Sequence, residues 1–143
     1  MSAKPKYFGF TVIELLVVIS IVAIVSATII PVGSAFLVRN HMSNKTNELV
    51  SSLRTAQISS MNGKEDMRWG VQVTASQIKL YAENDPAFNQ TFAIPASITI
   101  TQDTVLFNKL TGNPDATATF TITSNSSDST VITVNEVGTV DVN

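Results

Sequence analysis

The chain has no cysteine and only one histidine, His41, among its 143 residues. Without cysteine, neither a disulfide framework nor a zinc–thiolate site can form. A single histidine also excludes a metal site built from several histidines. An active site needs titratable groups gathered in one pocket, and the acids here are scattered through expected loops and strand ends. We therefore expect no enzymatic activity, no metal and no cofactor.

Charge is also scarce, since 14% of the residues are charged and the net charge is −2. Beyond Val71 the only basic residues are Lys79 and Lys109. Affinity for DNA comes mainly from Lys and Arg side chains that neutralise phosphates. DNA is therefore not expected as a partner. Calcium prefers oxygen ligands, and a loop at Asn113 and Asp115, or one at Asn125 and Asp128, is conceivable, although the spacing of an EF-hand is absent.

What the chain does have is one long apolar stretch. Residues 9–30 read GFTVIELLVVISIVAIVSATII, and no charge occurs in residues 15–38. Because a helix rises ~1.5 Å per residue, ~20 such residues cross a hydrocarbon layer of ~30 Å. The exception is Glu14, whose carboxylate would cost ~2.5–3.5 kcal/mol near the bilayer centre. The stretch therefore predicts a membrane helix. Because the charge on Glu14 is costly there, we expect Glu14 to have a partner and a function.

Lys4 and Lys6, then Gly9 followed by Phe10, and Glu14 inside the apolar run resemble the processing signature of the type IV pilin superfamily. The resemblance implies that a prepilin peptidase cuts between Gly9 and Phe10 and methylates Phe10. Glu14 then lies four residues after the new amino terminus. We expect its carboxylate to pair with the ammonium of Phe10, on a neighbouring subunit, because two charges in a membrane cost less when paired.

Two other interpretations remain open for this segment. A secretory signal peptide has a basic start, a short apolar region and a small-residue cleavage site, which Val25-Ser26-Ala27 could supply. It would have to carry Glu14 within an apolar region of unusual length. An ordinary single-pass anchor fits the length of the run but gives no reason for Glu14.

The chain divides into three expected parts. Residues 1–9 form the leader, residues 10–34 the transmembrane and assembly helix, and residues 35–143 a globular head. The helix begins at Phe10 and continues to about residue 62. Pro31 removes a backbone hydrogen bond and Gly33 favours helix poorly, so we expect a kink or a locally melted turn there.

Helical spacing returns in the first part of the head, where Met42, Leu49, Leu53 and Ala56 fall on one face. Gly63 suits the left-handed position that ends a helix. Alternation with period two then predicts strands, beginning with a hairpin of residues 69–73 and 78–82, with Trp69 in the core. We expect a loop over residues 84–90. Further strands are expected at residues 91–94, 97–101, 104–107, 117–123, 130–135 and 139–142.

The predicted fold is therefore α+β, a long N-terminal helix packed on a C-terminal antiparallel β-sheet head, as in pilins. The head loosely resembles the H-class minor pseudopilins of type II secretion and the T-class fimbrial minor pilins. The stretches that carry this resemblance are residues 47–60, 69–73, 105–108 and 132–140.

The resemblance implies a structural subunit of a pilus or secretion filament. It begins as a single-pass protein of the inner membrane, with its leader cytoplasmic and its head outside the cytoplasm. Its partners would be other pilin or pseudopilin subunits, the prepilin peptidase, the inner-membrane assembly platform and membrane lipid. Two alternatives are a DNA-uptake minor pilin and an anchored β-domain that never assembles. Some T-class pilins bind DNA through an arginine after a glycine, but residues 138–141 have no arginine and end in Asp141.

Overall fold

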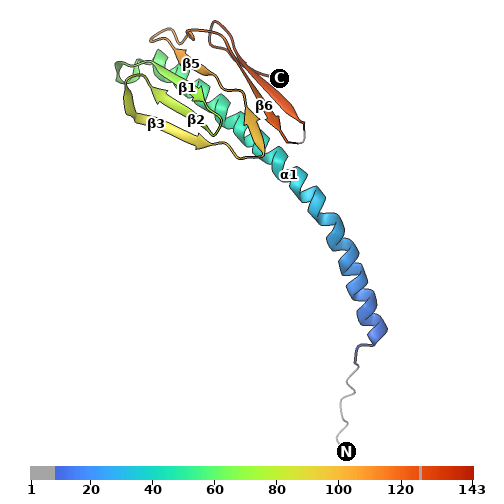
Figure 1. Ribbon diagram of the computed structural model, residues 1–143. Helices are drawn as coiled ribbons and strands as arrows, with labels where there is room; N and C mark the ends of the chain where they lie inside the picture. Colours follow the sequence, from blue (N-terminus) through green and yellow to red (C-terminus); the bar gives the residue numbers. More distant parts are fainter. Residues whose placement is uncertain (1–8, 126) are drawn as a thin grey trace, which may run out of the picture. The chain divides into compact units, whose positions relative to one another are not determined.

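The structure is a computed structural model that describes residues 9–125 and 127–143, without the side chains of residues 27–35. It contains one α-helix, α1 (Val12–Met61), and a short 3-10 helix, η1 (Lys64–Asp66) (Figure 1). The strands are β1 (Trp69–Val73), β2 (Gln77–Ala82), β3 (Asp85–Ala93), β4 (Ile98–Ile100), β5 (Thr104–Phe107), β6 (Ala118–Ser124), β7 (Ser129–Val134) and β8 (Val140–Val142). Internal contacts divide the chain into two units, Met1–Phe36 and Leu37–Asn143.

In the first unit, the described part of α1 exposes every side chain from Val12 to Ser26. The hydroxyls of Ser20 and Ser26 donate to the carbonyls of Leu16 and Val22, each at 2.7 Å, so these polar groups are satisfied within the helix. No helix in the described part of the chain meets the length and apolarity that crossing a bilayer requires.

Two predictions for the first unit concern residues outside the described part of the chain or residues without described side chains. Lys4 and Lys6 of the expected leader lie outside the described residues. The kink expected at Pro31 and Gly33 falls among residues whose side chains are not described. The leader, the kink and the three-part division of the chain all stay predictions.

The second unit is the head, residues 37–143, and its part of α1 has one buried face. Met42, Leu49, Leu53 and Ala56 are buried, as their spacing predicted. The helix ends at Met61, and Gly63 follows in the left-handed conformation with φ 59°. Glycine has no Cβ to oppose this conformation, which confirms the predicted helix stop.

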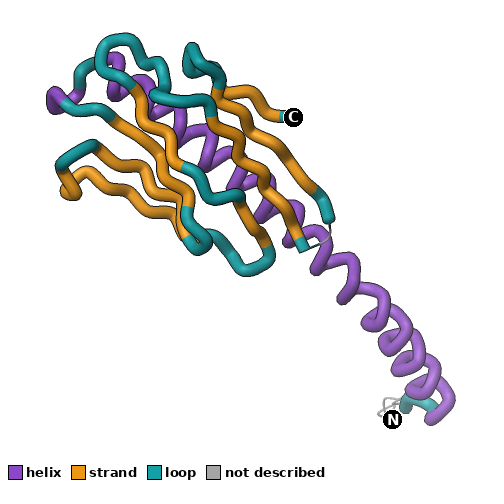
Figure 2. Tube along the Cα trace, turned by 45° about the horizontal axis from the view of Figure 1, so that its top comes forward, coloured by secondary structure: helices purple, strands orange, loops and turns teal. Residues whose placement is uncertain are grey.

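The strands of the head form two antiparallel sheets of four strands (Figure 2). Their orders are β3-β2-β1-β5 and β4-β6-β7-β8. The predicted first hairpin is confirmed, with Val71 opposite Leu80. The antiparallel α+β fold is likewise confirmed.

The loop expected over residues 84–90 is wrong, because β3 occupies most of it. This edge strand tolerates Pro86, since a proline without an N–H is acceptable where no neighbour requires that donor. Its register also shifts, with Leu80 opposite Gln90 but Ala82 opposite Asp85. The extra residues of this irregularity hide the period-two pattern that would have predicted the strand.

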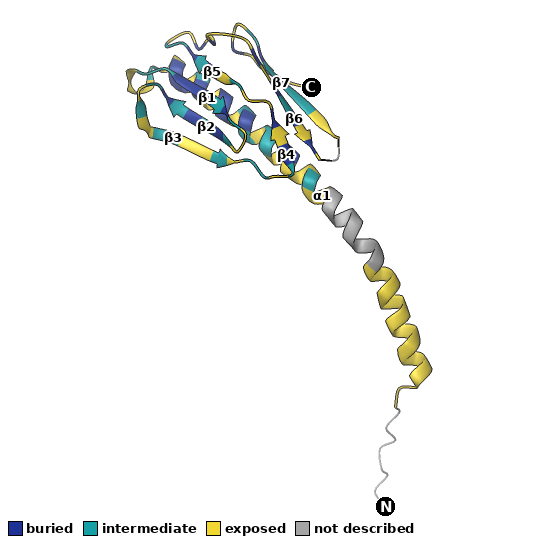
Figure 3. Ribbon diagram, viewed as in Figure 1, coloured by how far each residue is buried: buried dark blue, intermediate teal, exposed yellow. Residues whose placement is uncertain are grey.

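The core of the head lies between α1 and the two sheets (Figure 3). Phe107, Phe120, Leu49 and Leu53 are its largest fully buried members. Trp69 is 2% exposed, which confirms its predicted place in the core. Its ring packs on Phe88 at 5.7 Å between centroids, and its Nε1 donates to the carbonyl of Lys64 at 3.2 Å.

Candidate functional site

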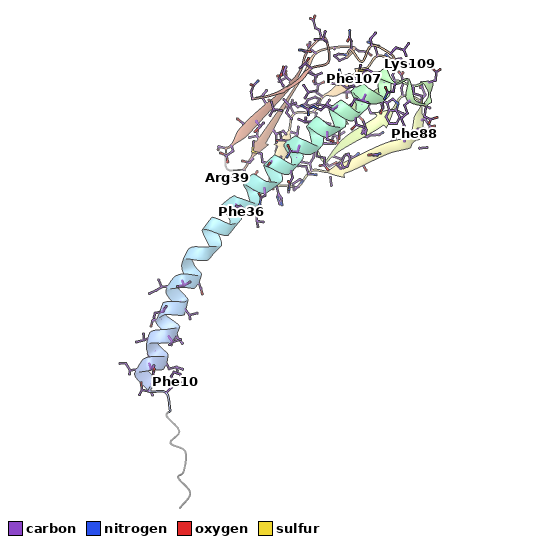
Figure 4. The ribbon with its side chains drawn as sticks, turned by 180° about the vertical axis from the view of Figure 1, so that it is seen from behind. Phe10, Phe36, Arg39, Phe88, Phe107 and Lys109 are labelled. Atoms are coloured by element: carbon purple, nitrogen blue, oxygen red, sulfur yellow. The ribbon has the colours of Figure 1, made fainter. Side chains whose placement is uncertain are left out.

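The predicted cleavage site lies just before α1. Gly9 and Phe10 have no regular secondary structure and are exposed. Figure 4 shows Phe10 at the start of the helix. A Cβ added to Gly9 would meet nothing within 4 Å, and Phe10 is 83% exposed. The bond between them is therefore accessible to a peptidase. Nothing in the described fold requires glycine at position 9.

The start of α1 is capped by Thr11. The backbone N–H of Glu14 donates to Thr11 Oγ1 at 3.3 Å, and the N–H of Leu15 donates to the carbonyl of Thr11 at 3.2 Å. A threonine followed three residues later by a glutamate is the capping-box pattern. The helix therefore begins at Val12, and our expectation that it begins at Phe10 is wrong by two residues. In the sequence, the Thr11–Glu14 spacing indicates this start of the helix.

Glu14 lies in the first turn of α1, where the helix dipole favours a negative charge. The ion pairs within the described residues all lie in the head and none includes Glu14. The site thus combines an accessible peptide bond with a carboxylate about one helical turn further on. The pairing of Glu14 with the ammonium of Phe10 stays a prediction, as do the roles of Gly9 and Phe10.

Beyond Glu14 the helix has apolar side chains on all its sides, each more than half exposed. They are Leu15, Leu16, Val17, Val18, Ile19, Ile21, Val22, Ile24 and Val25. At 3.6 residues per turn, consecutive residues point in different directions, so this run surrounds the helix. An amphipathic helix that covers a core in its own chain would instead have one apolar stripe.

Residues 4–30 match a family described as the prokaryotic N-terminal methylation motif. The match includes Gly9, Phe10, Glu14 and the whole apolar stretch of residues 9–30. The chain carries a prepilin-type N-terminal motif. This motif supports a type IV pilin-like precursor, and the α+β fold is consistent with that class. The motif implies processing by a prepilin peptidase and assembly with other pilin subunits, as a membrane-anchored precursor that then enters a filament.

No curated protein and no solved structure matches the chain. The family match covers the N-terminal motif and leaves the head outside it. The minor-pilin subclass expected from the head therefore stays a prediction.

In the head, Arg68 joins two otherwise separate segments. Its Nε and Nη2 donate to the two carboxylate oxygens of Glu83 at 2.7 and 2.6 Å, and its Nη1 donates to Asp115 at 3.0 Å. The hydrogen bond with Arg68 holds the pKa of Glu83 below its usual range. The same bond raises the pKa of Arg68. This network fastens the turn after β2 and the loop before β6 to the start of β1.

The two loops considered for calcium use their acids in ion pairs. Asp115 binds Arg68, and Asp128 lies 3.8 Å from Arg39 Nε. In the part of the chain that the structure describes, no three histidine, aspartate or glutamate side chains come together as metal ligands would. His41 is exposed on α1, with Nδ1 3.3 Å from Ser97 Oγ.

Proposed function

We propose that the chain is a structural subunit, a minor pilin or pseudopilin of a type IV pilus or type II secretion filament, rather than an enzyme. The precursor spans the inner membrane once, with its leader in the cytoplasm and its head on the other side. After cleavage following Gly9, the N-terminal part of α1 leaves the bilayer and packs among the helices of other subunits.

The observation that carries this proposal is the apolar surface of α1 over residues 12–25. Each large apolar side chain is stabilised by about 1.5–3 kcal/mol when it moves from water into an apolar environment. A helix with such side chains on every side therefore has a strong drive to be covered. The large apolar side chains of this segment are exposed in the described structure. Lipid in the precursor and neighbouring helices in the filament supply that cover.

Two further observations support processing and assembly over a simple membrane anchor. Gly9 has open space around it, so folding does not explain a glycine at this position, whereas recognition by a peptidase does. In a simple anchor the charge on Glu14 opposes insertion by more than the helix dipole offsets. In a filament it pairs with the ammonium that cleavage creates on Phe10, and it sets the axial register between subunits.

Several cations of the head already have acidic partners, which gives less support to a DNA-uptake function. Arg68 is held by Glu83 and Asp115, and Lys109 Nζ binds the carbonyl of Asp66 at 3.0 Å as well as its carboxylate. Lys45 likewise pairs with Glu48. Phosphate binding would require these cations to exchange existing partners. We therefore propose that the partners of the head are proteins.

Intact mass and N-terminal sequencing of the chain from cells with a matching peptidase test the proposal. We expect a mature chain that begins at methylated Phe10. Gly9→Val should block this cleavage and leave the fluorescence of Trp69 unchanged, because no neighbour contacts position 9. A mature chain that begins at Thr28 would show cleavage by a secretory signal peptidase and contradict the proposal.

A further inference from the structure

Strand β8 is an edge of the second sheet, and its register determines which backbone groups are free. Val131 and Asn143 exchange two backbone hydrogen bonds, of 2.8 and 2.9 Å. Ile132 is opposite Val142 and Val134 is opposite Val140. Antiparallel pairs alternate between bonded and non-bonded, so the N–H and C=O groups of Val140 and Val142 point away from β7. Among the described residues no strand pairs with that side.

The edge lacks most features that normally prevent pairing with another strand. Such edges are commonly blocked by lysine, proline, a bulge or a covering element. β8 reads Val140-Asp141-Val142, with neither lysine nor proline, and its register against β7 is regular. Its one protective residue is Asp141, which is exposed on the outer face of the sheet.

A groove of about 340 Å³ lies beside this edge, within the head. Its floor and walls come from one stretch of α1 and from β7 and β8, through Arg39, Met42, Ser43, Thr46, Asn47, Thr130 and Val142. Val142 is 47% exposed although its neighbour across the ladder, Ile132, is fully buried. The second sheet therefore ends at β8 before it covers the whole neighbouring surface of α1, and room for one more strand is left there. A strand added to β8 would direct alternate side chains into this groove, over Met42 and Val142.

Asp141 opposes pairing of this edge with a second copy of itself. If the β8 strands of two copies paired antiparallel about a two-fold axis, only one register would let the backbone groups of Val140 and Val142 in both copies form hydrogen bonds. In that register Val140 of each copy lies opposite Val142 of the other. That register sets Asp141 directly against Asp141 of the second copy, and like charges opposite each other are destabilising. A lysine or arginine opposite Asp141 on an added strand would instead form a favourable pair with its carboxylate.

We propose that β8 and the groove bind one extended segment of a different subunit of the same filament, by addition of a strand to the sheet. The segment places an apolar side chain in the groove and a lysine or arginine on the outer face beside Asp141. Naming the partner as a filament subunit rests on the proposed function. The free edge, the groove and the charge preference follow from the head alone.

A single cysteine at Thr139→Cys, labelled with a benzophenone in the otherwise cysteine-free full chain, tests the proposal in membranes that contain the machine. We expect a photo-adduct with a different filament subunit, mapped by mass spectrometry to an extended segment with a basic residue. Val142→Pro removes an outward N–H that β7 does not use, and should lower adduct yield about tenfold, the effect of one or two lost hydrogen bonds. Val142→Thr keeps the N–H and the branched shape and serves as the matched control.

Asp141→Lys should lower the yield to a similar extent, because it repels the basic residue of the partner. An adduct with a second copy of this chain would overturn the proposal, and so would equal yields from Val142→Pro and Val142→Thr. Loss of the adduct in a chain that is still cleaved after Gly9 would contradict this inference alone. Failure of cleavage would contradict the proposed function instead.

Discussion

The two parts of α1 differ in what covers them. Over residues 12–26 every side chain is exposed, although most are leucine, isoleucine, valine or alanine. Over residues 37–61 a single stripe, which includes Leu49 and Leu53, is fully buried in the core of the head. One α-helix thus has two patterns of apolar side chains, a single stripe in the head and a continuous surface near the N-terminus. The stripe is covered within the chain, and the continuous apolar surface needs cover from other molecules.

The comparison also separates two uses of charge. In the head, Arg68, Glu83 and Asp115 satisfy one another within the chain. At the start of α1, Glu14 has no ion-pair partner among the described residues. The network of Arg68, Glu83 and Asp115 therefore contributes to the stability of the head, whereas the charge on Glu14 forms no ion pair with the described residues.

Glu14→Gln gives the largest expected effect. Glutamine also suits the capping box, so the start of the helix is preserved while the charge is lost. Because an unpaired buried charge costs about 3–5 kcal/mol, incorporation into filaments should fall more than about a hundredfold. Immunoblots of sheared filaments against the membrane fraction measure this. Thr11→Val, which removes the cap and keeps the charge, should have a far smaller effect, and parental assembly of Glu14→Gln would refute the pairing.

Leu53→Ala and Leu16→Ala compare the two parts of α1 directly. Loss of a buried leucine costs about 2–5 kcal/mol, so Leu53→Ala should lower the free energy of unfolding of the head by about 3 kcal/mol. Leu16→Ala should leave it unchanged. Urea unfolding of the full chain in micelles, followed by the fluorescence of Trp69, measures both variants. A comparable loss in Leu16→Ala would show that the apolar run stabilises the head after all.

Gly138→Ala and Gly9→Ala compare the head with the segment before α1, and each adds a single methyl group. Gly138 has φ 82°, and an added Cβ would lie 2.7 Å from the carbonyl oxygen of Gly112. The strained conformation costs about 1–3 kcal/mol, which should appear as a lower midpoint in the same unfolding assay. Gly9→Ala meets no neighbour and should unfold like the parent. An unchanged midpoint for Gly138→Ala would mean that this turn relaxes freely.

Arg68→Met should have the smallest effect, and one that depends on pH. Since Arg68 lowers the pKa of Glu83 in the folded head, the stabilisation is present above the unfolded value of about 4.3 and is lost as the pH falls through the folded value. The parent should therefore be more stable than the variant at pH 7, and the gap should narrow below about pH 4. Thermal unfolding at several pH values tests this, with Arg54→Met as an exposed control. A gap that is constant with pH would exclude Glu83 as the cause.

Much of this protein could be predicted from local pattern. The N-terminal motif depends on residue types at short spacings, from Lys4 to Glu14. The buried stripe of α1 and the first hairpin follow from periods of 3.6 and two, because each period determines which side chains share a face. Gly63 marked the end of the helix, because a left-handed position suits glycine.

Tertiary structure decided the features that depend on residues distant in the sequence. The division into two sheets, the strand over residues 85–93 and the ion pairs of Arg68 with Glu83 and Asp115 have no local signature. The free edge of β8 also exists only because β7 takes one side of it and no described strand takes the other. Local preference acts over a few residues, whereas strand order and charge pairing are set by which distant segments the core brings together. The N-terminal motif and the apolar helix are therefore readable from the local sequence, whereas the fold of the head decides which strand edge stays unpaired among the described residues.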